Sequence, residues 1–102
     1  MDMRLAIIRM LTQLLEDMRA IQQQGAGYYS VVPFAKRYNK LLTEAQKLFS
    51  DRNPLIATFD TAEESDPKDP NYKGNVLQGI RVESGQLIAL LGALADTKEA
   101  NA

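Results

Sequence analysis

The chain has 102 residues, of which 45% are hydrophobic and 25% are charged, a balance typical of one globular domain. It contains no cysteine and no histidine, which excludes disulfide bridges, thiolate chemistry, the usual zinc ligand sets and nucleophiles activated by imidazole. Twelve basic and thirteen acidic side chains give a net charge of -1, so no overall field draws the chain to nucleic acid or an anionic membrane.

The first predicted helix covers residues 3–24. Its apolar side chains recur at alternating spacings of four and three residues, the period of a helix: Ile7, Leu11, Leu14, Met18 and Ile21. Leu5, Ile8 and Leu15 widen this stripe to the breadth expected of a helix in a globular bundle. Gly25-Ala26-Gly27 is expected to end the helix, because glycine tolerates the left-handed conformation of a C-cap.

A second long helix is predicted over residues 33–49, with Pro33 in its first turn. The same spacing of four and three residues recurs in Phe34, Tyr38, Leu41, Ala45 and Leu48, and Leu42 and Phe49 broaden that face. Asn53 followed by Pro54 is an N-cap followed by proline at the first helical position. A short helix is therefore predicted over residues 53–59.

Residues 60–73 are predicted to form an acidic loop, because they carry two prolines and almost no apolar side chains. We expect this loop to be solvated and to let the chain cross one end of the bundle. Asn75 and Gln78 resemble a capping box, and an apolar pattern of helical period follows them. The last helix is therefore predicted over residues 75–96.

Three long helical patterns, one short one and no segment of strand period predict a single all-α domain spanning residues 1–102, an antiparallel helical bundle. The N-terminus lacks the pattern of a signal peptide, so we expect a cytoplasmic protein. The longest weakly polar stretch, residues 87–95, is much shorter than the roughly 20 residues of a membrane-spanning helix, and no contact with a membrane is expected.

The last helix has two unlike faces. Large apolar residues fall on one side, together with Ser84: Leu77, Ile80, Leu87, Leu91 and Leu94. Small residues and one valine fall roughly opposite: Val82, Gly85, Ala89, Gly92 and Ala93. Since glycine costs about 1 kcal/mol against alanine inside a helix, a close contact is expected to offset the cost of Gly79, Gly85 and Gly92.

Two interpretations of this small face are open at the sequence level. In the simpler one the helix is central in the bundle, and the small residues let another helix of the same chain approach closely. In the other the small face is exposed and forms a two-fold contact between two copies. The residues proposed for partner binding are Gln78, Arg81, Val82, Gly85, Ala89 and Gly92. The several hydrogen-bond donors of the Arg81 guanidinium would set the register of the two helices.

The leading hypothesis is therefore a non-enzymatic interaction or assembly module that binds another copy of itself or another helical protein. The alternative is a nucleic-acid-binding accessory protein, in which basic side chains pair with phosphates and an aromatic ring stacks on a base. The residues that would do this are Tyr29, Lys36, Arg37 and Lys40. Four charges on the polar side of an amphipathic helix, here Lys36, Arg37, Lys40 and Lys47, are more often a solvated face, so nucleic acid is the less favoured partner.

Neither a metal, a cofactor nor a catalytic residue is predicted. The acidic loop supplies oxygen ligands of the kind that calcium prefers: Asp60, Glu63, Glu64, Asp66 and Asp69. Their spacing differs from that of a calcium loop, and prolines 67 and 70 favour an extended segment. Without imidazole or thiol groups, catalysis would need paired carboxylates. The carboxylates in the predicted helices have the spacing of exposed charges instead: Glu16, Asp17, Glu44 and Glu83.

Overall fold

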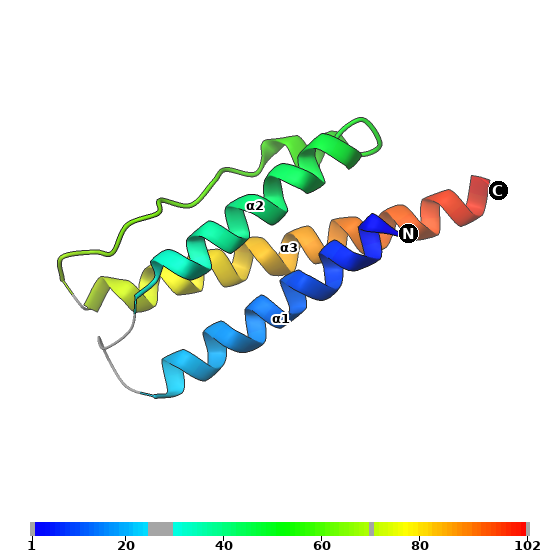
Figure 1. Ribbon diagram of the computed structural model, residues 1–102. Coiled ribbons are helices and arrows are strands. Elements are labelled where there is room, and N and C mark those ends of the chain that lie inside the picture. Colours follow the sequence, from blue (N-terminus) through cyan, green and yellow to red (C-terminus); the bar gives the residue numbers. More distant parts are fainter. Residues whose placement is uncertain (1, 25–29, 70, 102) are drawn as a thin grey trace.

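A computed structural model describes residues 2–24, 30–69 and 71–101 of the chain, and they form an all-α bundle without a strand. The elements in chain order are α1 (Met3–Gln23), α2 (Val32–Phe49), the short 3-10 helix η1 (Pro54–Thr58) and α3 (Asn71–Asn101). The long helices lie side by side in an elongated molecule of 49 × 22 × 19 Å (Figure 1). The predicted fold class is confirmed.

Helix α1 runs antiparallel to both of its neighbours, whereas α2 and α3 run in the same direction (Figure 1). The predicted antiparallel arrangement therefore holds for the two pairs that include α1 and is wrong for α2 with α3. Near the start of α1, Arg4 donates from Nη1 to the carbonyl oxygen of Leu91, late in α3, at 3.2 Å. The segment after η1, of which residues 59–69 are described, makes the parallel pair feasible by running back along the length of α2. We call residues 59–69 the returning segment. The expectation that this segment crosses one end of the bundle is therefore wrong.

Side chains cap the starts of α1 and η1, whereas α2 begins with Pro33 in its first turn and without a side-chain cap. The carboxylate of Asp2 accepts from the amide of Leu5 at 3.2 Å and caps α1. The predicted cap at Asn53 is confirmed, because its Oδ1 accepts from the amide of Leu55 at 3.0 Å. The short helix is nevertheless 3-10 and covers only five residues. The predicted stop at residues 25–27 lies outside the described residues.

Helix α3 is longer at both ends than the predicted 75–96. It begins at Asn71, where the amide of Tyr72 donates to the carbonyl oxygen of Asp69 at 3.0 Å. Asn75 therefore lies inside the helix, and the capping box predicted there is wrong. At the other end, Lys98 and its neighbours are good helix formers, so the helix continues to Asn101 beyond the start of α1 (Figure 1).

The core fills the space between the three long helices. It is made of side chains at helical spacing from each of them, with Val31 and Ile56 at its ends. Its largest fully buried members are Leu11, Met18, Tyr38, Leu42, Leu77, Leu87 and Leu91. Ser84 lies among these apolar groups with its Oγ unpartnered in the described part of the chain.

The buried side of α2 is rotated from the predicted stripe. Ala35 is fully buried and Phe49 nearly so, whereas the predicted core residue Leu48 is 39% exposed and Phe34 is only partly buried. The returning segment causes this rotation by covering a flank of α2 that carries polar residues. On that flank, Gln46 donates from Nε2 to the carbonyl oxygens of Ile56 and Phe59 at 3.2 and 3.0 Å.

Asn39 is the main anchor of the returning segment, and it is buried. Its Nδ2 donates to the carbonyl oxygen of Ala62 at 2.7 Å and to Oε2 of Glu64 at 2.8 Å. Its Oδ1 accepts from the amide of Ala62 at 2.7 Å. One side chain thus satisfies both backbone groups of Ala62, as a neighbouring strand would.

Asp66 makes a second anchor at the start of α2. Its carboxylate accepts from the amide of Val31 at 2.7 Å and from the hydroxyl of Ser30 at 2.8 Å. These two hydrogen bonds hold the pKa of the Asp66 carboxyl below its usual range. Glu64 and Asp66 are exposed, as expected of a solvated loop, but their hydrogen bonds also fasten the segment to α2 and to the two residues before it.

Candidate interaction surface

The side of α3 that faces away from the bundle carries no charge over most of its length. Between residues 75 and 94 the helix has only two charged residues, Arg81 and Glu83, and each lies at an edge of that side. We call the exposed uncharged residues between these edges the outer face. They are Asn75, Gln78, Gly79, Val82, Gly85, Gln86, Ala89 and Ala93.

The glycines of α3 have empty space where a side chain would point. A Cβ atom built on Gly79, Gly85 or Gly92 meets no atom within 4 Å apart from the glycine's own helical surroundings. Close packing within the described chain therefore does not require glycine at these positions. The interpretation that the small residues let another helix of the same chain approach is wrong, and the face is exposed.

The structure brings the proposed partner-binding residues onto one surface. Five of them are exposed, and Val82 is 55% exposed despite its apolar side chain. Gly92 is half-buried at the edge of the face. Arg81 leans toward α1, where its Nη1 donates to Oε1 of Gln22 at 3.0 Å.

An open groove of about 430 Å³ follows the α1 side of the outer face. Its lining from α1 is Leu15, Glu16 and Arg19, and its lining from α3 is Gln78, Arg81 and Val82. Two arginines and one glutamate thus border the outer face on this side. We call Arg19 and Arg81, with Glu16, the basic edge.

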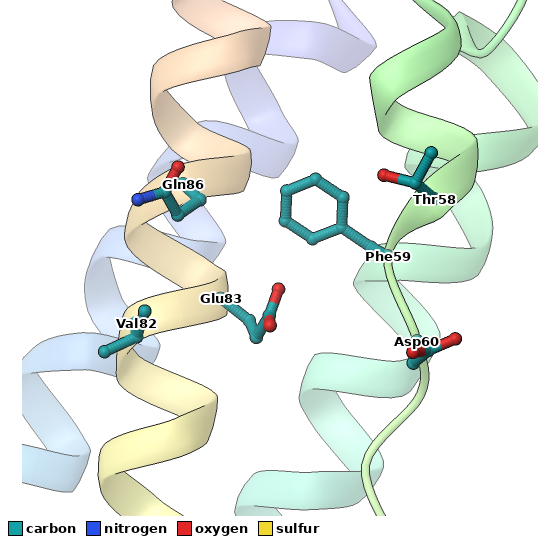
Figure 2. Close-up of a pocket in the computed structure, with 6 residues that line it drawn as sticks. All are labelled: Thr58, Phe59, Asp60, Val82, Glu83 and Gln86. Atoms are coloured by element: carbon teal, nitrogen blue, oxygen red, sulfur yellow. The ribbon is translucent and has the colours of Figure 1, made fainter.

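A groove of about 380 Å³ follows the opposite side of α3, where the returning segment begins. Figure 2 shows the ring of Phe59 extending from this segment toward Glu83 and Gln86 of α3. A neighbouring hollow of about 300 Å³ shares Asp60 and Glu83 and adds Glu63 and Tyr38 to the lining. We call Asp60, Glu63 and Glu83 the acidic edge, since no basic residue lines either hollow.

The phenol of Tyr38 is buried beside the acidic edge. Burial raises the pKa of its phenol to about 12, and the carboxylates of Glu83 and Asp60 act in the same direction. Its hydroxyl donates to the carbonyl oxygen of Asp60 at the long distance of 3.5 Å. The neutral phenol is the form that the folded chain favours.

This shift predicts a loss of stability at alkaline pH. The unfolded chain releases the Tyr38 proton near pH 10 and the folded chain near 12, so the contribution is fully present below pH 10 and falls as pH rises toward 12. Tyr38→Phe is expected to abolish this part of the loss, up to about 2 kcal/mol. Urea unfolding of both chains at about pH 8 and about pH 11.5 measures it. Equal losses in both chains would contradict the assignment.

The basic side chains of the alternative site lie elsewhere. Lys36, Arg37 and Lys40 are exposed on α2, whereas Tyr29 lies outside the described residues. Tyr38, the aromatic residue between them in the sequence, points into the core and is only 1% exposed. The described part of α2 therefore offers basic charge without an exposed aromatic ring for stacking on a base.

The other acidic residues do not converge on one point. Within the described ranges, no three side chains of the metal-ligating types come close enough to hold an ion. Glu16 and Asp17 are exposed neighbours on α1 and Glu44 is exposed on α2, and Asp17 accepts from Nε2 of Gln13 at 2.9 Å. The site that the structure does assemble is thus the outer face between its two charged edges.

The fold and this surface define a three-helix protein with an exposed, uncharged helix face. Comparisons with models of protein families, with curated proteins and with solved structures find no match to the chain. Within the described residues, none of the helices combines the length and the apolarity needed to cross a bilayer.

Proposed function

We propose that this protein is a non-enzymatic assembly module that associates through the outer face of α3, with a second copy of itself or with a helix of another protein. The observation that carries the proposal is the set of helical glycines that face empty space. In a monomer each costs about 1 kcal/mol relative to alanine and nothing within the described chain repays it. A partner backbone that approaches closely would make use of the missing side chains.

The composition of the face supports the same proposal. A solvent-exposed helix face normally carries charged residues, as the exposed sides of α1 and α2 do with Arg9, Asp17, Lys36 and Lys40. The outer face of α3 carries amides, glycines, alanines and Val82 instead. Depletion of charge at the centre with charged residues at the rim is the pattern of a protein–protein contact.

Nucleic-acid binding through Lys36, Arg37 and Lys40 is the weaker alternative. Its basic residues are exposed, yet the aromatic partner nearest to them on α2, Tyr38, is buried. The proposal includes no catalytic role, because imidazole and thiol groups, the commonest general bases and nucleophiles, are absent from the sequence.

Gly85→Leu tests the proposal directly. The leucine side chain enters open space in the monomer, so the variant is expected to fold with unchanged helicity. In a close contact the same side chain is expected to clash, and association is expected to weaken at least about tenfold. Light scattering over a concentration series, with circular dichroism as the check of folding, measures both effects.

Thr43→Leu is the matched control, because it adds the same side chain to an exposed position on α2. It is expected to associate as the unmodified chain does. Equal association of the unmodified chain and Gly85→Leu would contradict the proposal, as would an unmodified chain that stays monomeric at every concentration.

A further inference from the structure

We propose that the partner on the outer face is a second copy of this chain, and that the two α3 helices lie parallel, related by a two-fold axis that runs along them. This inference rests on the proposed function and adds the identity and the direction of the partner. Two features carry it: the opposite charge of the two edges, and the self-complementary chemistry of the face between them.

The edges differ in sign on the two sides of one helix. The basic edge has two arginines and one glutamate, and the acidic edge has three carboxylates and no basic residue in the lining of its hollows. Arg81 on the basic edge and Glu83 on the acidic edge are only two residues apart along α3. All of these side chains are exposed, and Arg81 keeps donors beyond the one that it gives to Gln22, so each can meet a second molecule.

The different charges of the two edges determine whether the two α3 helices of a symmetric dimer run parallel or antiparallel. If two outer faces meet with antiparallel helices, the two-fold axis crosses the helices and each edge faces the same edge of its partner. Three carboxylates then face three carboxylates. If the helices are parallel, the axis runs along them and each basic edge faces an acidic edge, twice in the dimer. Opposite charges across a contact attract and like charges are costly, so the parallel arrangement is favoured.

The face between the edges suits a copy of itself. In a parallel pair each residue meets its own counterpart at the same height along the axis. An amide group both donates and accepts hydrogen bonds, so Gln78 can pair with a second Gln78. Val82 meets a second Val82 and buries a side chain that is 55% exposed in the monomer. Gly85 and Ala89 leave room for the backbones to approach.

Cysteine cross-linking distinguishes the two directions, and the chain has no native cysteine to interfere. Gln78→Cys and Ala89→Cys are 11 residues apart, which is about 16 Å along a helix. A disulfide needs Cα atoms within about 7 Å of each other. In the parallel dimer, each single variant is therefore expected to form a disulfide-linked dimer in a glutathione redox buffer, and Lys40→Cys on α2 is the control that does not.

The outcomes separate this inference from the proposed function. An antiparallel pair cannot link both positions to themselves, so efficient linkage only in a mixture of the two variants would overturn the parallel direction and leave the proposed function standing. Absence of any linkage, together with a monomer in light scattering, would overturn both.

Charge reversal tests the pairing of the edges in the protein without cysteines. Arg81→Glu and Glu83→Arg are each expected to weaken association roughly fivefold at low salt. The double variant re-forms an opposite-charge pair between positions 81 and 83 across the contact, so it is expected to associate more strongly than Arg81→Glu alone. In an antiparallel pair Glu83→Arg would instead relieve repulsion and strengthen association. Strengthening by Glu83→Arg, or no change in either single variant, would overturn the pairing of opposite edges.

Discussion

Replacing Asn39 by aspartate is expected to lower the free energy of unfolding by about 3 kcal/mol at neutral pH. The change removes the Nδ2 donor that Ala62 and Glu64 share, and the carbonyl oxygen of Ala62 loses its partner. It also brings a new carboxylate next to that of Glu64, whose Oε2 lies 2.8 Å from Nδ2 of Asn39 in the unmodified chain. Urea unfolding followed by circular dichroism measures the loss, and acid pH is expected to reduce it by neutralising both carboxyl groups.

Thr43→Asp is the control for the added charge, because Thr43 is exposed on the same helix. It is expected to change stability by less than about 0.5 kcal/mol. If Asn39→Asp were as stable as this control, the returning segment would not be anchored through Asn39.

Changing Gly79, Gly85 and Gly92 together to alanine is expected to stabilise the isolated monomer by about 2 to 3 kcal/mol. The added methyl groups enter open space and remove the conformational freedom that glycine gives the unfolded chain. In a domain of this size the melting temperature is expected to rise by roughly 10 °C or more in dilute solution. Association is expected to weaken at the same time, because the methyl groups added at Gly79 and Gly85, on the outer face, then separate the backbones.

A gain in stability with a loss of association is the signature of residues kept for binding and not for folding. Gly74→Ala is the matched comparison, since Gly74 also faces open space but lies outside the outer face, near the start of α3. It is expected to leave association unchanged. Destabilisation by the triple change would show instead that the fold requires these glycines.

The long helices were predictable because their core residues repeat at the helical period. Ile7, Leu11, Leu14 and Met18 form the buried side of α1, in agreement with the sequence pattern. The start of α3 was not predictable from Asn75 and Gln78, because a sequence that resembles a cap also fits the interior of a helix. That helix begins instead where the amide of Tyr72 donates to the carbonyl oxygen of Asp69.

The rotation of the buried side of α2 has a different cause. Asn39 and Gln46 are polar, so the sequence assigns them to solvent. Their amides are satisfied by backbone groups of the segment that follows α2, between 10 and 23 residues away in the chain. Hydrogen bonds between residues so far apart in the chain leave no periodic pattern in the sequence. The same applies to the hydrogen bond that Asp66 accepts from the amide of Val31.

The candidate surface was partly predictable. The spacing of Val82, Gly85 and Ala89 places them on one side of a helix whatever its surroundings. Whether that side is covered depends on how many helices flank α3, which the sequence does not state. The acidic edge was missed because Asp60 and Glu63 belong to the segment whose path only the structure shows.

A dilution series of amide nitrogen–proton NMR spectra tests the central claim most directly, because it locates any association residue by residue. The proposal predicts concentration-dependent shifts at Gln78, Val82, Gly85 and Ala89, with no change at Lys36 and Lys40 on the exposed side of α2. Spectra that do not change with concentration, or shifts confined to α2, would contradict the assignment of the outer face of α3 as the surface of association.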